Sequence, residues 1–582
     1  MAKNIIRWLL AASLMAASAA LLLANPVAAA IAAASNAYIV LNYHDIPENG
    51  QKVGPFDRMA VARRNFEAQL DWLATNGYHF ISIQQVIDAH AGKTILPEKA
   101  VLLTFDDGFE SFYTRVFPIL KERHIPAVEA IIGTWMSRAE RPDVPGHKPV
   151  LTWAEVREMQ ASGLVEIASH TQNMHDEVDA DPQGETHAAV TTRAWLTALG
   201  RYETDAEYAA RLGAGMKRSS RFIEVATGHR PRVLVWPFGE YNGLAVAAAR
   251  RAGMPITLAL SDGVNNARND LSVINRLLVT DDPEVPAFAA MVTSLRADRP
   301  QRAIRVDLDT VWNADPATLA RNETALVKRV EASGATAVYV QAYADPDRNG
   351  AADALYFPNR HMKVRADLFS AVAERLKEAT GAKIYAMMPA RVTGATPAAG
   401  RWASDIYEDL AKYVPIDGLV LSSESLAYPA MHPGRNLSLA DATAGLTTRM
   451  RVYRPFIKTA LDVDSPPSRA QRAQRWFDRS LPHYLRQFDY VVVDAATGRH
   501  GTAQLARLVA DVDRGVGGLD RIVFGLSSRS ARTRHAAHAS ALRYDLEAML
   551  HSGARNIELR PGNYPGPQLL QLGKVFGTIV QE

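Results

Sequence analysis

The chain has 582 residues, well beyond the roughly 250–300 that one hydrophobic core supports, so it predicts two domains. Its 48% hydrophobic and 22% charged residues exclude wholesale disorder and a polytopic membrane protein. A net charge of only +3, with basic and acidic residues interspersed, argues against nucleic acid as a partner. The absence of cysteine excludes disulfides, thiolate metal sites, a cysteine nucleophile and an N-terminal lipobox.

The N-terminal segment has the order of a secretory signal peptide, which we predict over residues 1–34. Lys3 and Arg7 precede an apolar stretch from Trp8 to Ala24, and small residues follow up to Ala34. The alternative is an uncleaved anchor, because the apolar stretch nearly reaches the ~20 residues of a spanning helix. In both cases the rest of the chain is predicted to lie outside the cytoplasm.

Residues 35–300 are predicted to form a first α/β domain, since short β-branched apolar runs alternate there with longer amphipathic stretches. Several runs end in polar residues, which matters because α/β barrels carry their sites at the carboxyl ends of strands. The expected strands are Tyr38–Leu41, Ala100–Thr104, Val128–Ile132, Leu164–Ala168, Arg232–Trp236 and Thr257–Leu260.

A second domain is predicted over residues 301–582, because the pattern breaks around Ala297–Gln301 and then starts afresh. About eight strand-like runs with helical stretches between them favour a (β/α)₈ barrel. These runs are Ile304–Leu308, Ala337–Gln341, Lys383–Met388, Gly418–Leu421, Ile457–Leu461, Tyr490–Val493, Ile522–Leu526 and Asn556–Leu559.

Two strand ends in the first domain carry groups suited to metal chemistry. Asp106 and Asp107 follow one strand, and His170 and His175 follow another. Adjacent acids on an extended segment point to opposite sides, so one can bind a cation while the other accepts a proton. Two histidines and one carboxylate suit a catalytic divalent ion. Taken singly, the acids also fit a turn or helix cap, and the histidines fit surface or core imidazoles.

These motifs resemble those of the polysaccharide deacetylases, carbohydrate esterase family 4. The resemblance rests on Thr104–Gly108, on Ser169–Thr171 with His175, and on Trp236–Gly239. It is sharpest to the poly-β-1,6-N-acetyl-D-glucosamine N-deacetylases of Gram-negative biofilm export. Their deacetylase domain is circularly permuted, so a catalytic histidine appears near its start, as in Leu41–Asp45 here.

The resemblance implies a role for each of these residues. Asp107, His170 and His175 would hold one divalent ion, which is zinc, nickel, cobalt or iron, while Asp106 would be the general base and His44 the general acid. Amide hydrolysis needs such a set, because water must be activated and an amine leaves only when it is protonated.

The third motif is expected to contact the substrate through Trp236 and Phe238, with a backbone N–H near Phe238 stabilising the oxyanion. Many deacetylases carry an arginine in this motif that orients the base, where this chain has Val235. Arg276 is a possible substitute, and an ordinary surface arginine is the alternative.

In the resembled branch the C-terminal barrel binds partly deacetylated polymer and can cleave it. Where the resemblance leads us to expect a His-Asp-Asp cluster, this chain has Ser422, Ser423 and Glu424, and the strand Ile522–Leu526 also lacks an expected acid. We therefore expect a barrel that binds without cutting. Candidate contacts to glucosamine ammonium groups, with helix and turn caps as the alternative role, are Asp307, Asp309, Asp345 and Asp347.

The resulting hypothesis is a periplasmic N-deacetylase that acts on exported poly-β-1,6-N-acetyl-D-glucosamine, with an outer-membrane export porin as a further partner. Two alternatives stay open at this point. One is a noncatalytic polymer-binding or export protein. The other is a deacetylase of chitin or peptidoglycan fragments, which the resemblance of the second domain disfavours.

Overall fold

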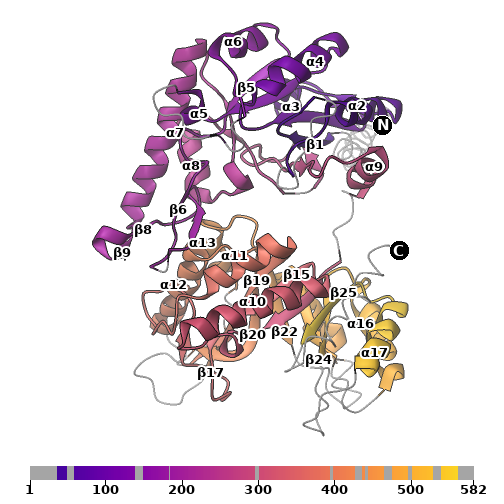
Figure 1. Cartoon of the computed structure of the whole chain (residues 1–582). Coiled ribbons are helices and arrows are strands. Elements are labelled where there is room, and N and C mark those ends of the chain that lie inside the picture. Colours follow the sequence, from indigo (N-terminus) through magenta and orange to yellow (C-terminus); the bar gives the residue numbers. More distant parts are fainter. Residues whose placement is uncertain are drawn as a thin grey trace, which may run out of the picture. The chain divides into compact units, whose positions relative to one another are not determined.

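The computed structural model describes residues 36–48, 58–137, 144, 148–182, 184–261, 263–294, 300–393, 397–426, 436–438, 443–463, 475–495, 501–527 and 539–560. The predicted signal peptide lies outside these residues. The chain divides into two compact units, Met1–Ala180 with Thr186–Asp298, and Asp181–Glu185 with Arg299–Glu582 (Figure 1). Among the described helices, none combines the length and the apolar character needed to cross a membrane.

The first unit contains one curved sheet whose strands are parallel except for β12. Along the sheet the order is β11 (Ile256–Leu258), β10 (Val233–Val235), β5 (Val165–Ser169), β4 (Ala127–Ile131), β3 (Ala100–Phe105), β1 (Ala37–Tyr43) and β12 (Asn265–Asn266). Two further strands pair off this path, β2 (His79–Phe80) with β3 and β13 (Leu277–Leu278) with β1. Short hairpins form from β6 (Glu177–Asp179) with β7 (Thr186–Ala188), and from β8 (Trp195–Leu196) with β9 (Arg201–Tyr202).

Strand alternation separates two apolar faces of this sheet. Ile39, Leu41 and Tyr43 of β1 belong to a core shared with the outer helices, whereas Tyr38 and Val40 belong to the core of the inner face. The helices that supply the outer core are α2 (Arg63–Thr75), α4 (Phe117–Arg123), α6 (Trp153–Ala161), α7 (Asp205–Thr227) and α9 (Val285–Ser294). The inner core includes α3 (Ile83–His90), and α7 with α8 (Gly243–Arg251) packs on the outer side of β10.

The inner face becomes polar toward the carboxyl ends of its strands. On β3, Ala100 and Leu102 are apolar, and Thr104 and then Asp106 follow on the same face. On β1, Asn42 follows Val40 in the same way and is fully buried. The sequence thus places a buried polar cluster at one end of an otherwise apolar inner face.

The second unit is a closed barrel of eight parallel strands, because β19 pairs with β15 and β20 and so completes the ring. Its strands are β14 (Arg302–Val306), β15 (Ala337–Gln341), β19 (Lys383–Thr393), β20 (Gly418–Leu426), β22 (Lys458–Val463), β23 (Tyr490–Asp494), β24 (Ile522–Ser527) and β25 (Asn556–Arg560). The helices between them are α10 (Pro316–Ser333), α11 (Phe369–Thr380), α12 (Pro397–Tyr413), α13 (Thr443–Arg451), α15 (Leu481–Gln487), α16 (Gly501–Val516) and α17 (Ala539–His551).

The predicted fold class of two (β/α)-barrel-type domains is confirmed. Each apolar run named above corresponds to a strand. The short strands β12 and β13 were not predicted, because Asn265–Asn266 and Leu277–Leu278 are too short to show a periodic pattern.

Candidate active site

Asp107, His170 and His175 meet at the carboxyl ends of β3 and β5. Oδ1 of Asp107 lies 3.5 Å from Nε2 of His170 and 3.4 Å from Nε2 of His175. One potential ligand atom from each residue lies within 4.8 Å of the other two. The structure therefore brings together the three residues for which a metal-binding role was predicted.

Local contacts leave two of these side chains, His170 and Asp107, suited to a cation. Nδ1 of His170 donates a hydrogen bond to the carbonyl of Val235 at 2.9 Å, which leaves the lone pair of Nε2 directed elsewhere. Oδ1 of Asp107 is buried and has no hydrogen-bond partner among the described residues. A divalent ion would satisfy this oxygen, so the donor set fits the implied metal.

The pKa values of these three side chains also fit a metal site. Burial raises the pKa of Asp107 to about 6 and lowers the pKa of His170 to about 3. Burial also lowers the pKa of His175. Neutral imidazoles are the form that binds metals, and a cation would offset the cost of keeping Asp107 ionised.

Asp106 points to the inner face and forms a buried ion pair with Arg276. Nη1 of Arg276 donates to Oδ1 at 2.7 Å and Nη2 donates to Oδ2 at 2.9 Å. Burial disfavours the charged carboxylate, but Arg276, with His170 and His44, outweighs it and holds the pKa of Asp106 well below its usual range. Arg276 thus contacts the predicted base, and the alternative of a surface arginine is wrong because Arg276 is 0% exposed. Its role in orienting the base stays a prediction.

Asn42 is a contributor that the sequence did not reveal. Its Nδ2 donates to Oδ2 of Asp106 at 3.1 Å, and its Oδ1 accepts from Nη1 of Arg276 at 2.6 Å. It lies two residues before His44 in a motif already noted, and alternation along β1 was the signal that it faces inward. Nε2 of His44 lies 3.9 Å from Oδ2 of Asp106, so the predicted acid and base are neighbours.

The third motif, Trp236–Gly239, contains one buried and one exposed aromatic residue. Trp236 is fully buried and packs on the outer side of β10 against α7 and α8, and its indole N–H donates to Oγ1 of Thr257 at 2.8 Å. The prediction that Trp236 contacts substrate is therefore wrong, since alternation turns it away from the inner face. Phe238 is 47% exposed, and its ring centroid lies 4.8 Å from that of His175.

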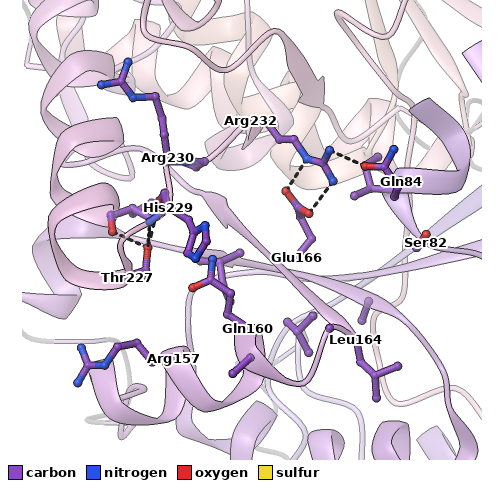
Figure 2. Close-up of a pocket in the computed structure, with 18 residues that line it drawn as sticks. Ser82, Gln84, Arg157, Gln160, Leu164, Glu166, Thr227, His229, Arg230 and Arg232 are labelled. Carbon is purple, nitrogen blue, oxygen red and sulfur yellow. Dashed lines mark hydrogen bonds and ion pairs between the residues drawn. The ribbon is translucent and has the colours of Figure 1, made fainter. Parts of the chain in front are cut away.

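A pocket of about 660 Å³ lies at the other ends of these strands, around Ala127, Val165 and Arg232. Figure 2 shows the Arg232 guanidinium between Glu166 and Gln84, with which it makes hydrogen bonds of 2.7 to 3.0 Å. None of the predicted site residues lines this pocket.

The carboxyl end of the second barrel is crossed by an ion-pair ring, formed by Arg305, Glu558, Arg560 and Asp462. Arg305 contacts Glu558 at 2.5 Å and Asp462 at 2.8 Å, and Arg560 contacts the same two acids at 2.9 and 2.7 Å. Arg560 also reaches Asp494 at 3.2 Å. A Cβ at position 525 would lie 2.7 Å from the Arg560 guanidinium, so Gly525 of β24 leaves the space that this side chain occupies.

On β20, Ser422 is buried, and its hydroxyl donates to the carbonyl of Met388 at 3.2 Å. The side chains of Ser423 and Glu424 lie outside the described residues. The expectation that the barrel binds polymer without cutting it therefore stays a prediction.

The four acids predicted to contact glucosamine take part in turns of the second unit. Asp307 accepts from the N–H of Asp309, and Asp309 accepts from the N–H of Asp345 and from the hydroxyl of Tyr356. Asp345 accepts from the N–H of Gly350, and Asp347 accepts from that of Asn349. Their predicted contact with substrate is untested, but each has a structural role.

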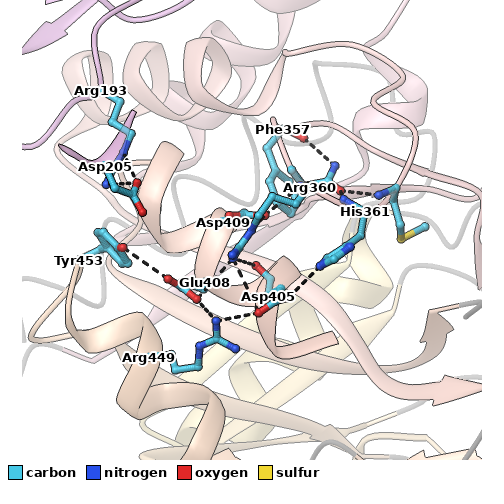
Figure 3. Close-up of polar contacts among 12 residues, drawn as sticks. Arg193, Asp205, Phe357, Arg360, His361, Asp405, Glu408, Asp409, Arg449 and Tyr453 are labelled. Atoms are coloured by element: carbon cyan, nitrogen blue, oxygen red, sulfur yellow. Dashed lines mark hydrogen bonds and ion pairs between the residues drawn. The ribbon is translucent and has the colours of Figure 1, made fainter. Parts of the chain in front are cut away.

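Arg360, in the loop before α11, also has a structural role. Figure 3 shows its guanidinium among the acids of α12. Nε of Arg360 donates to Asp409 at 3.0 Å, and Arg449 of α13 pairs with Asp405 at 2.7 Å. This network ties the loop before α11 to α12 and α13.

Two family models match the two domains of the chain. The polysaccharide deacetylase family matches residues 93–257, and hypothetical glycosyl hydrolase family 13 matches residues 305–393 and 432–559. The chain is 36% identical to a solved de-N-acetylase from Aggregatibacter actinomycetemcomitans, over 44% of this chain and 99% of that one, with a TM-score of 0.41. It is 26% identical to the PgaB (BpsB) glycoside hydrolase domain from Bordetella bronchiseptica, over 47% and 98%, with a TM-score of 0.39.

The full-length relative is more informative. The chain is 31% identical to the poly-beta-1,6-N-acetyl-D-glucosamine N-deacetylase of Escherichia coli (strain K12), over 81% of this chain and 80% of that protein. Because it covers 81% of this chain, the similarity extends into both domains. The chain belongs to the poly-β-1,6-N-acetyl-D-glucosamine N-deacetylase family and is a polysaccharide N-deacetylase.

Proposed function

We propose that the chain hydrolyses the acetamido groups of poly-β-1,6-N-acetyl-D-glucosamine with the help of one divalent metal ion. The observation that carries the proposal is the convergence of Asp107, His170 and His175 beside the Asp106–Arg276 pair. The substrate follows from the relatives, whose names specify this polymer.

Each of these residues has a separate role in the proposed amide hydrolysis. A divalent ion held by Asp107, His170 and His175 would act as a Lewis acid and lower the pKa of a bound water. Asp106 remains ionised because of Arg276, so it is available to accept a proton. His44, 3.9 Å from Asp106, would donate a proton to the leaving amine. The exposed ring of Phe238 offers the sugar an apolar surface beside His175.

The second domain, in this proposal, binds the partly deacetylated polymer without cutting it. Glycoside cleavage needs a carboxyl group that can protonate the glycosidic oxygen. Among the described residues of the barrel's carboxyl end, Asp462 and Glu558 are each paired with two arginines. Burial opposes ionisation of Asp462, but Arg305 and Arg560 outweigh it and keep its pKa below the usual range. Such a group is a poor acid catalyst near neutral pH.

We further propose that the mature protein works in the periplasm during export of the polymer for biofilm formation, next to an outer-membrane porin. The support is the signal-peptide order of residues 1–34. N-terminal sequencing of the protein from a periplasmic fraction is expected to show cleavage after Ala30 or Ala34. Recovery only in the membrane fraction, with Lys3 and Arg7 retained, would indicate an anchor instead.

The decisive experiment measures acetate release and bound metal on the same preparation. β-1,6-Linked N-acetylglucosamine oligomers should release acetate, chitin oligomers should release far less, and a chelator should stop the reaction reversibly. Zinc, nickel, cobalt and iron are added back in turn to identify the active ion. Full activity in metal-free protein would reject the proposed mechanism.

A further inference from the structure

Asp45 is a buried acid that directly follows the predicted general acid, and the proposed mechanism gives it no role. Its Oδ1 accepts a hydrogen bond from the hydroxyl of Ser111 at 2.7 Å, and its Oδ2 pairs with Nζ of Lys148 at 2.9 Å. Ser111 is also buried, and its hydroxyl oxygen accepts from the N–H of Ile46 at 3.2 Å. The carbonyl of Asp45 accepts from the N–H of Val61 at 3.0 Å. The side chain and the backbone of Asp45 are thus both held in place.

Both partners of this carboxylate come from segments beside the turn that carries the metal-site acids. Ser111 lies four residues after Asp107 in the sequence. The N–H of Leu151, three residues after Lys148, donates to the carbonyl of Gly108 at 2.9 Å. The carboxylate therefore joins the loop after β1 to the turn after β3.

The imidazole of His44 depends on the backbone that carries it. Among the described residues its buried Nδ1 makes no hydrogen bond, and its Nε2 lies 3.9 Å from Oδ2 of Asp106, beyond hydrogen-bond distance. On one side of His44, the carbonyl of Tyr43 accepts from the N–H of Asp106 at 3.0 Å, where β1 pairs with β3. On the other side, the anchor is Asp45.

We propose that Asp45 is a positioning residue, which holds the loop after β1 through Ser111 and Lys148 so that Nε2 of His44 reaches the leaving nitrogen. The inference rests on the proposed function, in which the proton on Nε2 passes to this nitrogen as the carbon–nitrogen bond breaks and leaves its electron pair there. A misplacement of about 1 Å can slow a catalytic step by about 10²-fold. Asp45 should therefore affect the rate only through His44.

A double-mutant cycle on the full-length protein with its metal bound tests this dependence. The measured quantity is kcat for acetate release from β-1,6-linked N-acetylglucosamine oligomers, in the parent, Asp45→Ala, His44→Ala and the double variant. Asp45→Ala is expected to lower kcat by about 10–100-fold in the parent background, but by less than about twofold in the His44→Ala background. Metal content should equal that of the parent, and circular dichroism checks that each variant is folded.

Hydrolysis of 4-nitrophenyl acetate provides a second readout, because its phenolate leaves without being protonated. Asp45→Ala and His44→Ala should each cleave this ester at nearly the parent's rate, since the metal ligands and Asp106 are unchanged in both. If Asp45→Ala does not fold, Asp45→Asn replaces it in both assays. Its amide keeps an oxygen for Ser111 and loses the ion pair with Lys148, so a smaller loss of kcat for the oligomers is then expected, again only when His44 is present.

Glu203 provides the matched control, because it is another buried acid of the first unit that pairs with a cation. Its carboxylate pairs with Arg211 at 2.7 Å and accepts from the N–H of Ala194 at 3.1 Å. Glu203→Ala should lower thermal stability and leave kcat for the oligomers unchanged.

The outcomes separate the two proposals. A parent protein that releases no acetate from the oligomers would overturn the proposed function. An active parent whose kcat is unchanged in Asp45→Ala or its replacement would overturn the role of Asp45. That role also fails if the substitution lowers kcat as much in the His44→Ala background as in the parent, or slows the aryl ester equally, since the loss would then not depend on His44.

Discussion

Arg276 and Asp106 form a two-pronged ion pair, at 2.7 and 2.9 Å, in which the two side chains are 0% and 2% exposed. Removing one partner of a buried pair leaves an uncompensated charge, which typically costs about 3–5 kcal/mol. We expect Arg276→Gln to destabilise the first unit strongly. The exposed pair of Arg58 with Asp281 provides the control, since Arg58→Gln should change the free energy of unfolding little.

The same substitution should alter the pH dependence of acetate release. Arg276 keeps the pKa of Asp106 well below its usual range, and the base works only when it is ionised. Without Arg276 this pKa rises, so activity should be lost at a higher pH on the acid side than in the parent. An unchanged acid limb in the pH–rate profile of folded Arg276→Gln would exclude Asp106 as the group that controls it.

Metal binding and proton transfer should separate by mutation. His170→Ala removes a ligand, so it should abolish both metal binding and acetate release. Asp106→Asn should keep the metal, but its rate of acetate release should fall by about 10²–10⁴-fold, the usual contribution of general-base catalysis. Metal content and initial rates are measured together, with the exposed His229 changed to Ala as the control. Retention of more than about a tenth of the rate in Asp106→Asn would indicate another base.

Phe238 should affect substrate binding more than chemistry. Its ring is about half exposed beside His175, and a phenyl ring has no proton that it could transfer in the reaction. Phe238→Ala is expected to raise KM for β-1,6-linked oligomers with a smaller loss of kcat. Trp236→Phe should instead lower thermal stability and leave KM unchanged, because Trp236 is buried among α7 and α8.

The ion-pair ring should make stability of the second unit depend on pH. The folded pKa of Asp462 lies below its unfolded value, so its contribution is fully present above the unfolded pKa near 4 and is lost as the pH falls through the folded pKa. Arg305→Gln should therefore be destabilised relative to the parent at neutral pH, and calorimetry should show the difference shrinking in acid. Arg555→Gln, which breaks an exposed pair with Asp520, should show no such trend.

The full-length protein should bind partly deacetylated polymer without shortening it. Ser422 and Ser423 have no proton acidic enough to serve a glycosidic oxygen, and Glu424 is the acid that remains in this stretch. Mass spectrometry of the polymer after incubation tests this. Shortened products that are missing with Glu424→Gln would show that the acid has moved along β20.

Most strands and four of the site residues were predictable because they depend on patterns within short stretches of the sequence. Apolar runs gave the strands, and polar residues at their ends gave Asp106, Asp107, His170 and His175. Trp236 was misjudged because a motif match says nothing about which side of a strand a residue faces. Counting alternate positions from Val235, which belongs to the inner core, would have turned it outward.

Long-range pairings were not predictable. The contacts of Asn42 with Arg276, and of Arg305 with Asp462, join segments far apart in the chain, and neither depends on a local pattern. Such residues depend on packing that only the assembled fold provides.

The parallel pairing of β1 with β13 determines when the site is completed. Leu41 aligns with Leu277. His44 and Arg276, which lie near opposite ends of the sequence of the first unit, can therefore both reach Asp106 only after the chain between them has closed a long loop. Closing long loops costs entropy before any contact repays it, so such pairings form late. Because a chain is synthesised from its N-terminus, the two acids (Asp106 and Asp107) and the two histidines (His170 and His175) are made before Arg276. An incomplete chain that ends before Arg276 therefore carries the predicted metal ligands and Asp106 without the arginine that pairs with that carboxylate.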